Sequence, residues 1–105
     1  GNGFDLKLAK ELYNAVSIPL VIHGGAGDKQ HVLDVTRELP ISGIAIASLF
    51  HYDFILNNRQ LDGFEDEGNI EFLKSNKVPS SIKSVSIKKL KLFLAGNNVN
   101  CRIDA

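Results

Sequence analysis

Two apolar runs, each ending in small residues, constrain the fold of this chain of 105 residues more than any other feature. Residues 18–23 read Ile-Pro-Leu-Val-Ile-His, and residues 43–47 read Gly-Ile-Ala-Ile-Ala. Continuous apolar runs of this kind are typical of strands buried on both faces, as in a parallel sheet. Residues 29–39, between them, have helical spacing. The order strand, helix, strand predicts an α/β fold with parallel strands.

Three helices are expected, over residues 6–15, 29–39 and 87–95. Asp5, Asp28 and Ser86 precede them, and such side chains accept hydrogen bonds from the first N–H groups of a helix. Gly96 is expected to close the last helix in a left-handed conformation. The first helix is expected to cover the sheet with one apolar face, formed by Leu8, Ala9, Leu12, Tyr13 and Val16.

The region after the second strand has weaker patterns. Residues 49–52 are expected to form a short helical turn. Residues 53–83 are polar, include the acidic run 65–67 and show no sustained period, so they predict a surface insertion with one short element near residues 70–73. The tail, residues 99–103, alternates weakly and is expected to be extended.

Composition excludes several classes of function. Twelve Lys and Arg balance twelve Asp and Glu, so no overall field favours nucleic acid or an anionic membrane as a partner. No apolar run approaches the roughly 20 residues of a membrane-spanning helix. Cys101 is the one cysteine, which excludes an internal disulfide and fits a reducing cytoplasm. The chain has no Met and opens on Gly1, so we expect it to be part of a longer protein.

The residues at the two strand ends are candidates for anion binding. Gly24 and Gly25 follow the first strand, and Ala47 and Ser48 follow the second. Glycine lets backbone N–H groups approach an anion closely, and the free N–H groups of a helix N-terminus add positive potential. A glycine loop alone is more often a tight turn. Because the carboxyl ends of parallel strands share one edge of a sheet, the paired motifs favour a phosphate site.

Two segments carry a resemblance to a known family. Residues 23–27, His-Gly-Gly-Ala-Gly, and residues 43–52, Gly-Ile-Ala-Ile-Ala-Ser-Leu-Phe-His-Tyr, closely resemble the cyclase (HisF-like) subunit of imidazole glycerol phosphate synthase. The resemblance includes residues 3–5 and resumes in residues 86–103, and it covers roughly seventy residues outside the insertion. It implies a (β/α)8 barrel of the ribulose-phosphate-binding type, with this chain as the C-terminal part that carries the seventh and eighth strands.

The resemblance also implies roles for residues and partners. Gly24, Gly25, Ala47 and Ser48 match the family's site for one phosphate of a phosphorylated small-molecule substrate. The family's general acid and base are aspartates on the first and fifth strands, so no catalytic residue is expected here and the chain alone should not turn over substrate. A partner glutaminase (HisH-like) would supply ammonia, and neither a cofactor nor a metal is required. The implied reaction is the cyclisation that forms imidazole glycerol phosphate in histidine biosynthesis.

Two departures from the family pattern keep alternatives open. His23 stands where the family usually has Ser, and it could contact substrate or be a satisfied strand-end side chain. The insertion at residues 53–83 is absent from the ordinary subunit and resembles that of paralogues associated with amidation of surface-polysaccharide sugars. A non-catalytic phosphate-binding module that folds alone is disfavoured, because the open edges of a two-stranded sheet invite association.

The remaining polar side chains have structural interpretations. Asp5 is read as a helix cap and not as a catalyst. The spacings of His23, His31 and His51 match no compact metal motif, and His31 is expected on an exposed helix. His51 and Tyr52 are expected to support the short helix beneath the phosphate site.

Overall fold

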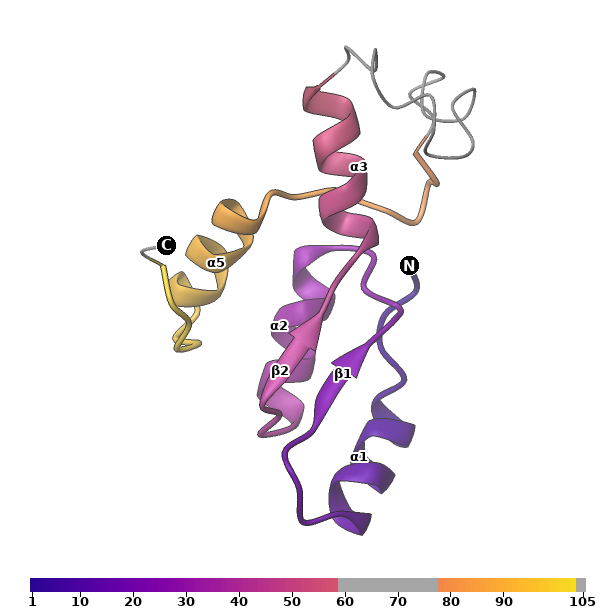
Figure 1. Cartoon of the computed structure of the whole chain (residues 1–105), viewed down its shortest axis with the longest axis vertical. Helices are drawn as coiled ribbons and strands as arrows, with labels where there is room; N and C mark the ends of the chain where they lie inside the picture. The colour runs from indigo at the N-terminus through magenta and orange to yellow at the C-terminus, as the bar shows by residue number, and fades with distance from the viewer. Residues whose placement is uncertain (59–77, 104–105) are drawn as a thin grey trace.

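The chain is an α/β structure with a small parallel sheet. The computed structural model describes residues 1–58 and 78–103 (Figure 1). The elements in chain order are α1 (Leu6–Ala15), β1 (Val21–His23), α2 (Lys29–Glu38), β2 (Gly43–Ala45), α3 (Ser48–Asn57) and α5 (Ile87–Gly96). The predicted order of helices and strands is therefore confirmed over these residues.

The two strands pair in parallel and place their carboxyl ends side by side. Val21 lies opposite Gly43, and His23 lies opposite Ala45. Each strand has three residues, which is shorter than the apolar runs predicted. Within the described residues each strand has one neighbour, so the rest of each run has no second strand with which to form a ladder. In Figure 1 both strands run towards α3, which begins just beyond the end of β2.

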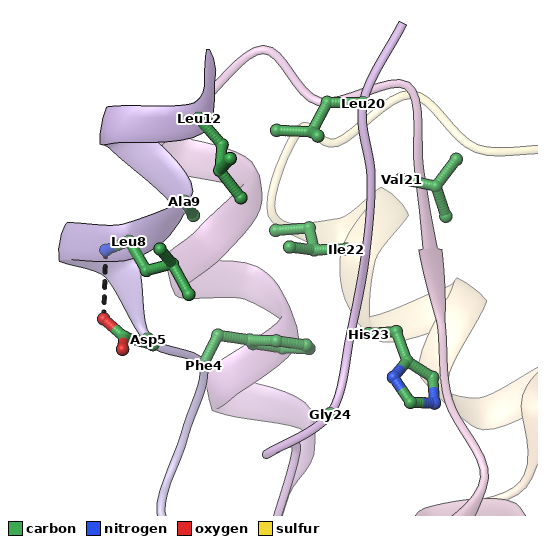
Figure 2. A pocket seen from close by; sticks show the side chains of 10 residues that line it. All are labelled: Phe4, Asp5, Leu8, Ala9, Leu12, Leu20, Val21, Ile22, His23 and Gly24. Carbon is green, nitrogen blue, oxygen red and sulfur yellow. Dashed lines mark hydrogen bonds between the residues drawn. The ribbon is translucent and has the colours of Figure 1, made fainter. Parts of the chain in front are cut away.

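Among the described elements, helices cover one face of the sheet only. Leu20 and Ile22 point towards α1, whereas Val21 and His23 point to the opposite side (Figure 2). Val21 is 60% exposed, so the prediction of strands buried on both faces is wrong for the described part of the chain. The physical reason is that α1 and α2 pack on the same side of the strands, and no described element lies over the other side. One apolar face of the sheet therefore remains open to another layer.

Helix α1 has the predicted bounds but not the predicted burial. The Oδ1 atom of Asp5 accepts a hydrogen bond from the N–H of Leu8 at 3.0 Å, which confirms the cap (Figure 2). Of the five apolar residues expected to face inward, Ala9 alone is buried. Leu8 and Leu12 are 50% and 45% exposed, because they border an open groove between α1 and β1. The most buried apolar residue of this helix is thus its smallest one.

The hydrophobic core lies between α2, α3, α5 and residues 24–27, which we call the glycine loop. Six buried side chains form one cluster: Ala26, Val32, Leu33, Leu49, Leu90 and Leu94. Helix α2 supplies two of them and ends one residue earlier than predicted, at Glu38. At the amino end of α2, the ammonium of Lys29 lies 4.7 Å from the ring centre of Phe93 on α5. The core thus joins the element after β1 to the last helix.

Helix α3 is longer than the short turn predicted at residues 49–52. It extends from Ser48 to Asn57, so the first five residues of the predicted insertion are helical. Leu49 and Ile55 are buried on this helix, and the side-chain amide of Asn57 donates to the carbonyl of Asp53. Asp53 interrupts the apolar pattern in the sequence, which concealed the second half of the helix. The acidic run 65–67 and the element expected near 70–73 lie outside the described residues.

Helix α5 ends in a left-handed residue, but at a different position from the one predicted. Gly96 is the last helical residue, and Asn98 has the positive φ, +65°. The N–H of Asn98 bonds the carbonyl of Ala95, and the N–H of Val99 bonds that of Leu94. This pair of bonds is the Schellman motif, in which Asn is the usual substitute for Gly. The tail beyond it forms no strand up to residue 103, and the Cys101 thiol donates to the carbonyl of Lys91.

A candidate anion-binding site at the strand ends

The parallel register brings the two predicted motifs to one hollow. Its volume is about 200 Å³, and its walls are residues 23–26 after β1 and residues 45–48 after β2. A space of this size can hold several water molecules. Gly24, Gly25, Ala47, Ser48 and His23 all line it, so the structure brings together every site residue named from the sequence.

Two residues of the glycine loop have a positive φ, a backbone conformation that residues with a side chain adopt only with strain. Gly24 has φ +89° and Gly25 has φ +101°. At Gly24 a Cβ atom would meet nothing within 4 Å, whereas at Gly25 it would collide with the carbonyl oxygen of Gly3. The N–H of Gly3 also donates to the carbonyl of Gly25 at 2.8 Å. Gly24 is therefore required for its conformation, and Gly25 for both its conformation and its contact with the N-terminal segment.

The other wall of the hollow is the amino end of α3. Its N-cap, Ala47, forms no side-chain capping bond. The other three described helices are capped by Asp5, Asp28 and Ser86, whose side chains accept N–H groups of the first turn. The first N–H groups of any helix lack partners within the helix. At α3 no N-cap side chain accepts these donors, and Ser48, the first residue of the helix, lies in the wall of the hollow.

The walls carry no Asp, Glu, Lys or Arg side chain. Any attraction for an anion would come from backbone N–H groups and from the helix N-terminus, which acts as roughly half a positive charge. His23 is the one ionisable side chain in the lining, and it is exposed. Its ring has no hydrogen-bond partner among the described residues. The arrangement can hold an anionic group, but it contains no acid and base pair for chemistry on carbon.

Two further segments hold the glycine loop in place. The N–H of Gly27 donates to Nδ1 of His31 at 3.0 Å, and the carbonyl of Gly27 accepts from the N–H of Lys83 at 2.7 Å. The N–H of Val85 donates to the carbonyl of Leu49 at 3.3 Å. The segment 82–85, which we call the strap, therefore bonds the residue that follows each wall of the hollow.

Sequence reasoning missed both the strap and the role of His31. His31 was expected on an exposed helix, yet its ring is partly buried and bonded. A signal for it existed, because His31 is the third residue after the cap Asp28, a position from which a side chain can reach back to the start of a helix. No sequence pattern predicts the strap, because its hydrogen bonds join main-chain atoms. Ala26, Ala45 and Ile46, which complete the lining, were likewise not identified.

Other possible functional features are limited over residues 1–58 and 78–103. His51 is exposed and packs edge-on against Tyr52, with ring centres 5.3 Å apart on α3. No three His, Cys, Asp or Glu side chains in these ranges gather closely enough to hold a metal ion. Among the described helices, none has the length and apolar character needed to cross a membrane.

Comparisons with known proteins match the part of the chain that carries this hollow. The family model described as "Histidine biosynthesis protein" matches residues 1–56. The protein named imidazole glycerol phosphate synthase subunit HisF from Streptococcus sanguinis is 41% identical over 51 residues. The proteins of the same name from Streptococcus gordonii and Bacillus cereus are 41% and 37% identical over 51 residues.

These matches cover 49% of this chain and 20% of each relative. The chain thus spans about one fifth of the length of the curated relatives that it matches. No solved structure matches it significantly.

Proposed function

We propose a function for this chain from one premise: it belongs to the family of histidine biosynthesis proteins. In this proposal, the chain is the C-terminal part of a (β/α)8 barrel of the ribulose-phosphate-binding type, with β1 and β2 as its seventh and eighth strands. The open face of the sheet, where Val21 is exposed, supports this assignment, because it would then line the barrel interior. The full-length protein would act as the cyclase-type subunit of imidazole glycerol phosphate synthase.

The contribution of this chain would be one phosphate site. The single observation that carries the proposal is the hollow shared by Gly24, Gly25, Ala47 and Ser48, with the uncapped amino end of α3 as one wall. Barrel enzymes of this type commonly bind phosphate at the loops after the last two strands. Backbone N–H groups in a fixed loop would hold the phosphate without any basic side chain.

Holding the phosphate would fix the position of the substrate for chemistry elsewhere. Because the hollow contains no acid and base pair, proton transfer would depend on aspartates at the ends of the first and fifth strands, outside this chain. Ammonia would come from a partner glutaminase subunit, and the reaction would close an imidazole ring with no cofactor. The isolated chain would bind part of the substrate without converting it.

A second candidate function follows from where the matches stop. The family match ends at residue 56, close to where α3 ends and the predicted insertion continues. A cyclase-like barrel that carries an insertion there would suit a paralogue that assists the amidation of a sugar in surface-polysaccharide biosynthesis. Both candidates would use the same phosphate site and ammonia, so they differ in the substrate and in the reaction that the ammonia enters.

The phosphate site is tested by changing Gly25→Asp in the full-length protein. The added side chain would collide with the Gly3 carbonyl and displace the loop, and its carboxylate would repel an anion, so the KM for the phosphorylated substrate should rise by at least about tenfold. Gly96→Asp is the matched control, because Gly96 is exposed at the end of α5 with nothing within 4 Å of an added Cβ. An unchanged KM in Gly25→Asp would overturn the proposed site.

The two substrates are separated by genetics. If the protein is the histidine-pathway cyclase, its gene should restore growth without histidine to a strain that lacks the cyclase subunit. Gly25→Asp should fail in the same strain, and Gly96→Asp should succeed. A deletion strain that still grows without histidine, but has an altered surface polysaccharide, would favour the sugar-amidation candidate instead.

A further inference from the structure

We infer that His31 is a positioning residue for the anion site, and that it acts as a hydrogen-bond acceptor through its unprotonated Nδ1 atom. The inference rests on the proposed phosphate site and adds to it a side chain that does not line the hollow. His31 lies on the first turn of α2, and it would act on the ligand through Gly27 and the glycine loop.

The hydrogen bond itself requires a specific state of the ring. The N–H of Gly27 is the donor and Nδ1 of His31 is the acceptor, at 3.0 Å. A ring nitrogen can accept only if it carries no proton, so the ring must be neutral with its proton on Nε2. The cap Asp28 accepts the backbone N–H of His31 at 3.1 Å, and Asp34 on α2 lines a small hollow together with His31.

At the start of α2 this hydrogen bond complements those that the Asp28 side chain accepts. The Asp28 carboxylate accepts backbone N–H groups of the first turn, while the His31 ring reaches back to the N–H of Gly27, just before the cap. This resembles a capping box, with imidazole in place of the usual Glu or Gln. Gly27 is buried, so without this bond its N–H would have neither a protein partner nor water, which would lower the stability of the folded protein.

Gly27 has little freedom to move without altering the anion site. A Cβ atom there would collide with the carbonyl oxygens of Gly1 and Ser81, and its own carbonyl is bonded to the strap at Lys83. The loop that begins at Gly24 is therefore fixed at its far end by the ring of His31 and by main-chain bonds. Loss of the ring acceptor would remove one of these attachments, so the backbone at Gly24 and Gly25 would be held less firmly around the hollow.

A pair of variants separates this role from simple packing. In His31→Asn the amide oxygen occupies nearly the position of Nδ1, since both atoms are bonded to Cγ, so the acceptor is kept. In His31→Leu the acceptor is lost, although Leu packs well and is the better helix former of the two. Packing and helix propensity therefore favour Leu, whereas the hydrogen bond favours Asn.

The experiment measures the dissociation constant of inorganic phosphate by calorimetry on the full-length protein. We expect His31→Leu to bind phosphate about tenfold more weakly than the unmodified protein, and His31→Asn to stay within about threefold of it. Equal binding by His31→Leu and the unmodified protein, or weaker binding by His31→Asn than by His31→Leu, would overturn the inference. If the unmodified protein bound no phosphate, the proposed site itself would fail, and this is a separate result.

A measurement on the unmodified protein avoids the question of whether a variant folds. Long-range nitrogen–proton NMR spectra distinguish the two neutral forms of a histidine ring. We expect the neutral His31 ring to carry its proton on Nε2, because Nδ1 accepts from Gly27. A ring with its proton on Nδ1 cannot accept from Gly27, and that result would rule out the inference without any substitution.

Discussion

Alanine substitutions at Gly24 and Gly25 would separate backbone strain from steric contact in the loop that lines the hollow. The two residues have similar positive φ angles, +89° and +101°, so each should lose about 1–3 kcal/mol of stability from conformation when changed to Ala. At Gly24 the added methyl meets nothing within 4 Å. At Gly25 it collides with the Gly3 carbonyl oxygen, so the N-terminal segment must move.

The difference between the two variants can be estimated from that movement. Displacing the segment breaks the bond from the Gly3 N–H to the Gly25 carbonyl, at 2.8 Å, which contributes about 1 kcal/mol net. Forcing a methyl group into a packed contact adds about 1–3 kcal/mol. We therefore expect Gly25→Ala to be roughly 2 kcal/mol or more less stable than Gly24→Ala.

Urea unfolding of the full-length protein, followed by circular dichroism, provides the comparison. Gly96→Ala is the control, because Gly96 is helical, exposed and without positive φ, and Ala there should be neutral or stabilising by up to about 1 kcal/mol. Equal midpoints for Gly24→Ala and Gly25→Ala, with equal slopes, would refute the argument, since the Gly3 contact would then contribute nothing.

Substitutions at four other positions test the fold by the same unfolding assay. Asp28→Ala removes the acceptor for two N–H groups and should cost about 0.5–2 kcal/mol, whereas Asp28→Asn should retain most of the stability. Leu49→Ala, at a fully buried position, should cost about 2–5 kcal/mol. Lys10→Ala should cost less than about 1 kcal/mol, because its 2.9 Å ion pair with Glu38 is half exposed; a larger loss would contradict this. Asn98→Gly should preserve stability while Asn98→Ala loses about 1 kcal/mol, because φ is +65° there.

Local signals in the sequence determined what could be predicted. The caps at Asp5, Asp28 and Ser86 were identified because a cap depends on a side chain and on backbone N–H groups within three residues of it. The hollow at the strand ends was anticipated for a similar reason: two parallel strands in register must bring their carboxyl ends together, and Gly24 and Ser48 mark those ends.

The features that were predicted wrongly depend on contacts that the sequence does not encode locally. Helical spacing placed Leu8 and Leu12 on one face of α1, but their burial depends on what lies opposite, and the groove there is open. Gly96 was expected to close α5 because Gly adopts a left-handed conformation most easily, yet Asn98 does so two residues later. The helix includes Gly96 and is followed by the cap residue Asn97, so the residue that adopts positive φ is Asn98.

The main-chain bonds of the strap have a practical consequence for work on this site. Lys83 contacts Gly27 through its N–H, and residue 83 is exposed, so its side chain can be exchanged without breaking that bond. A cysteine introduced at position 83 could carry a fluorescent dye, which would then be attached to a residue that is hydrogen-bonded to Gly27. Such a label would report ligand entry while leaving every residue of the hollow unaltered, and the chain's own cysteine, Cys101, lies on a separate segment beside α5.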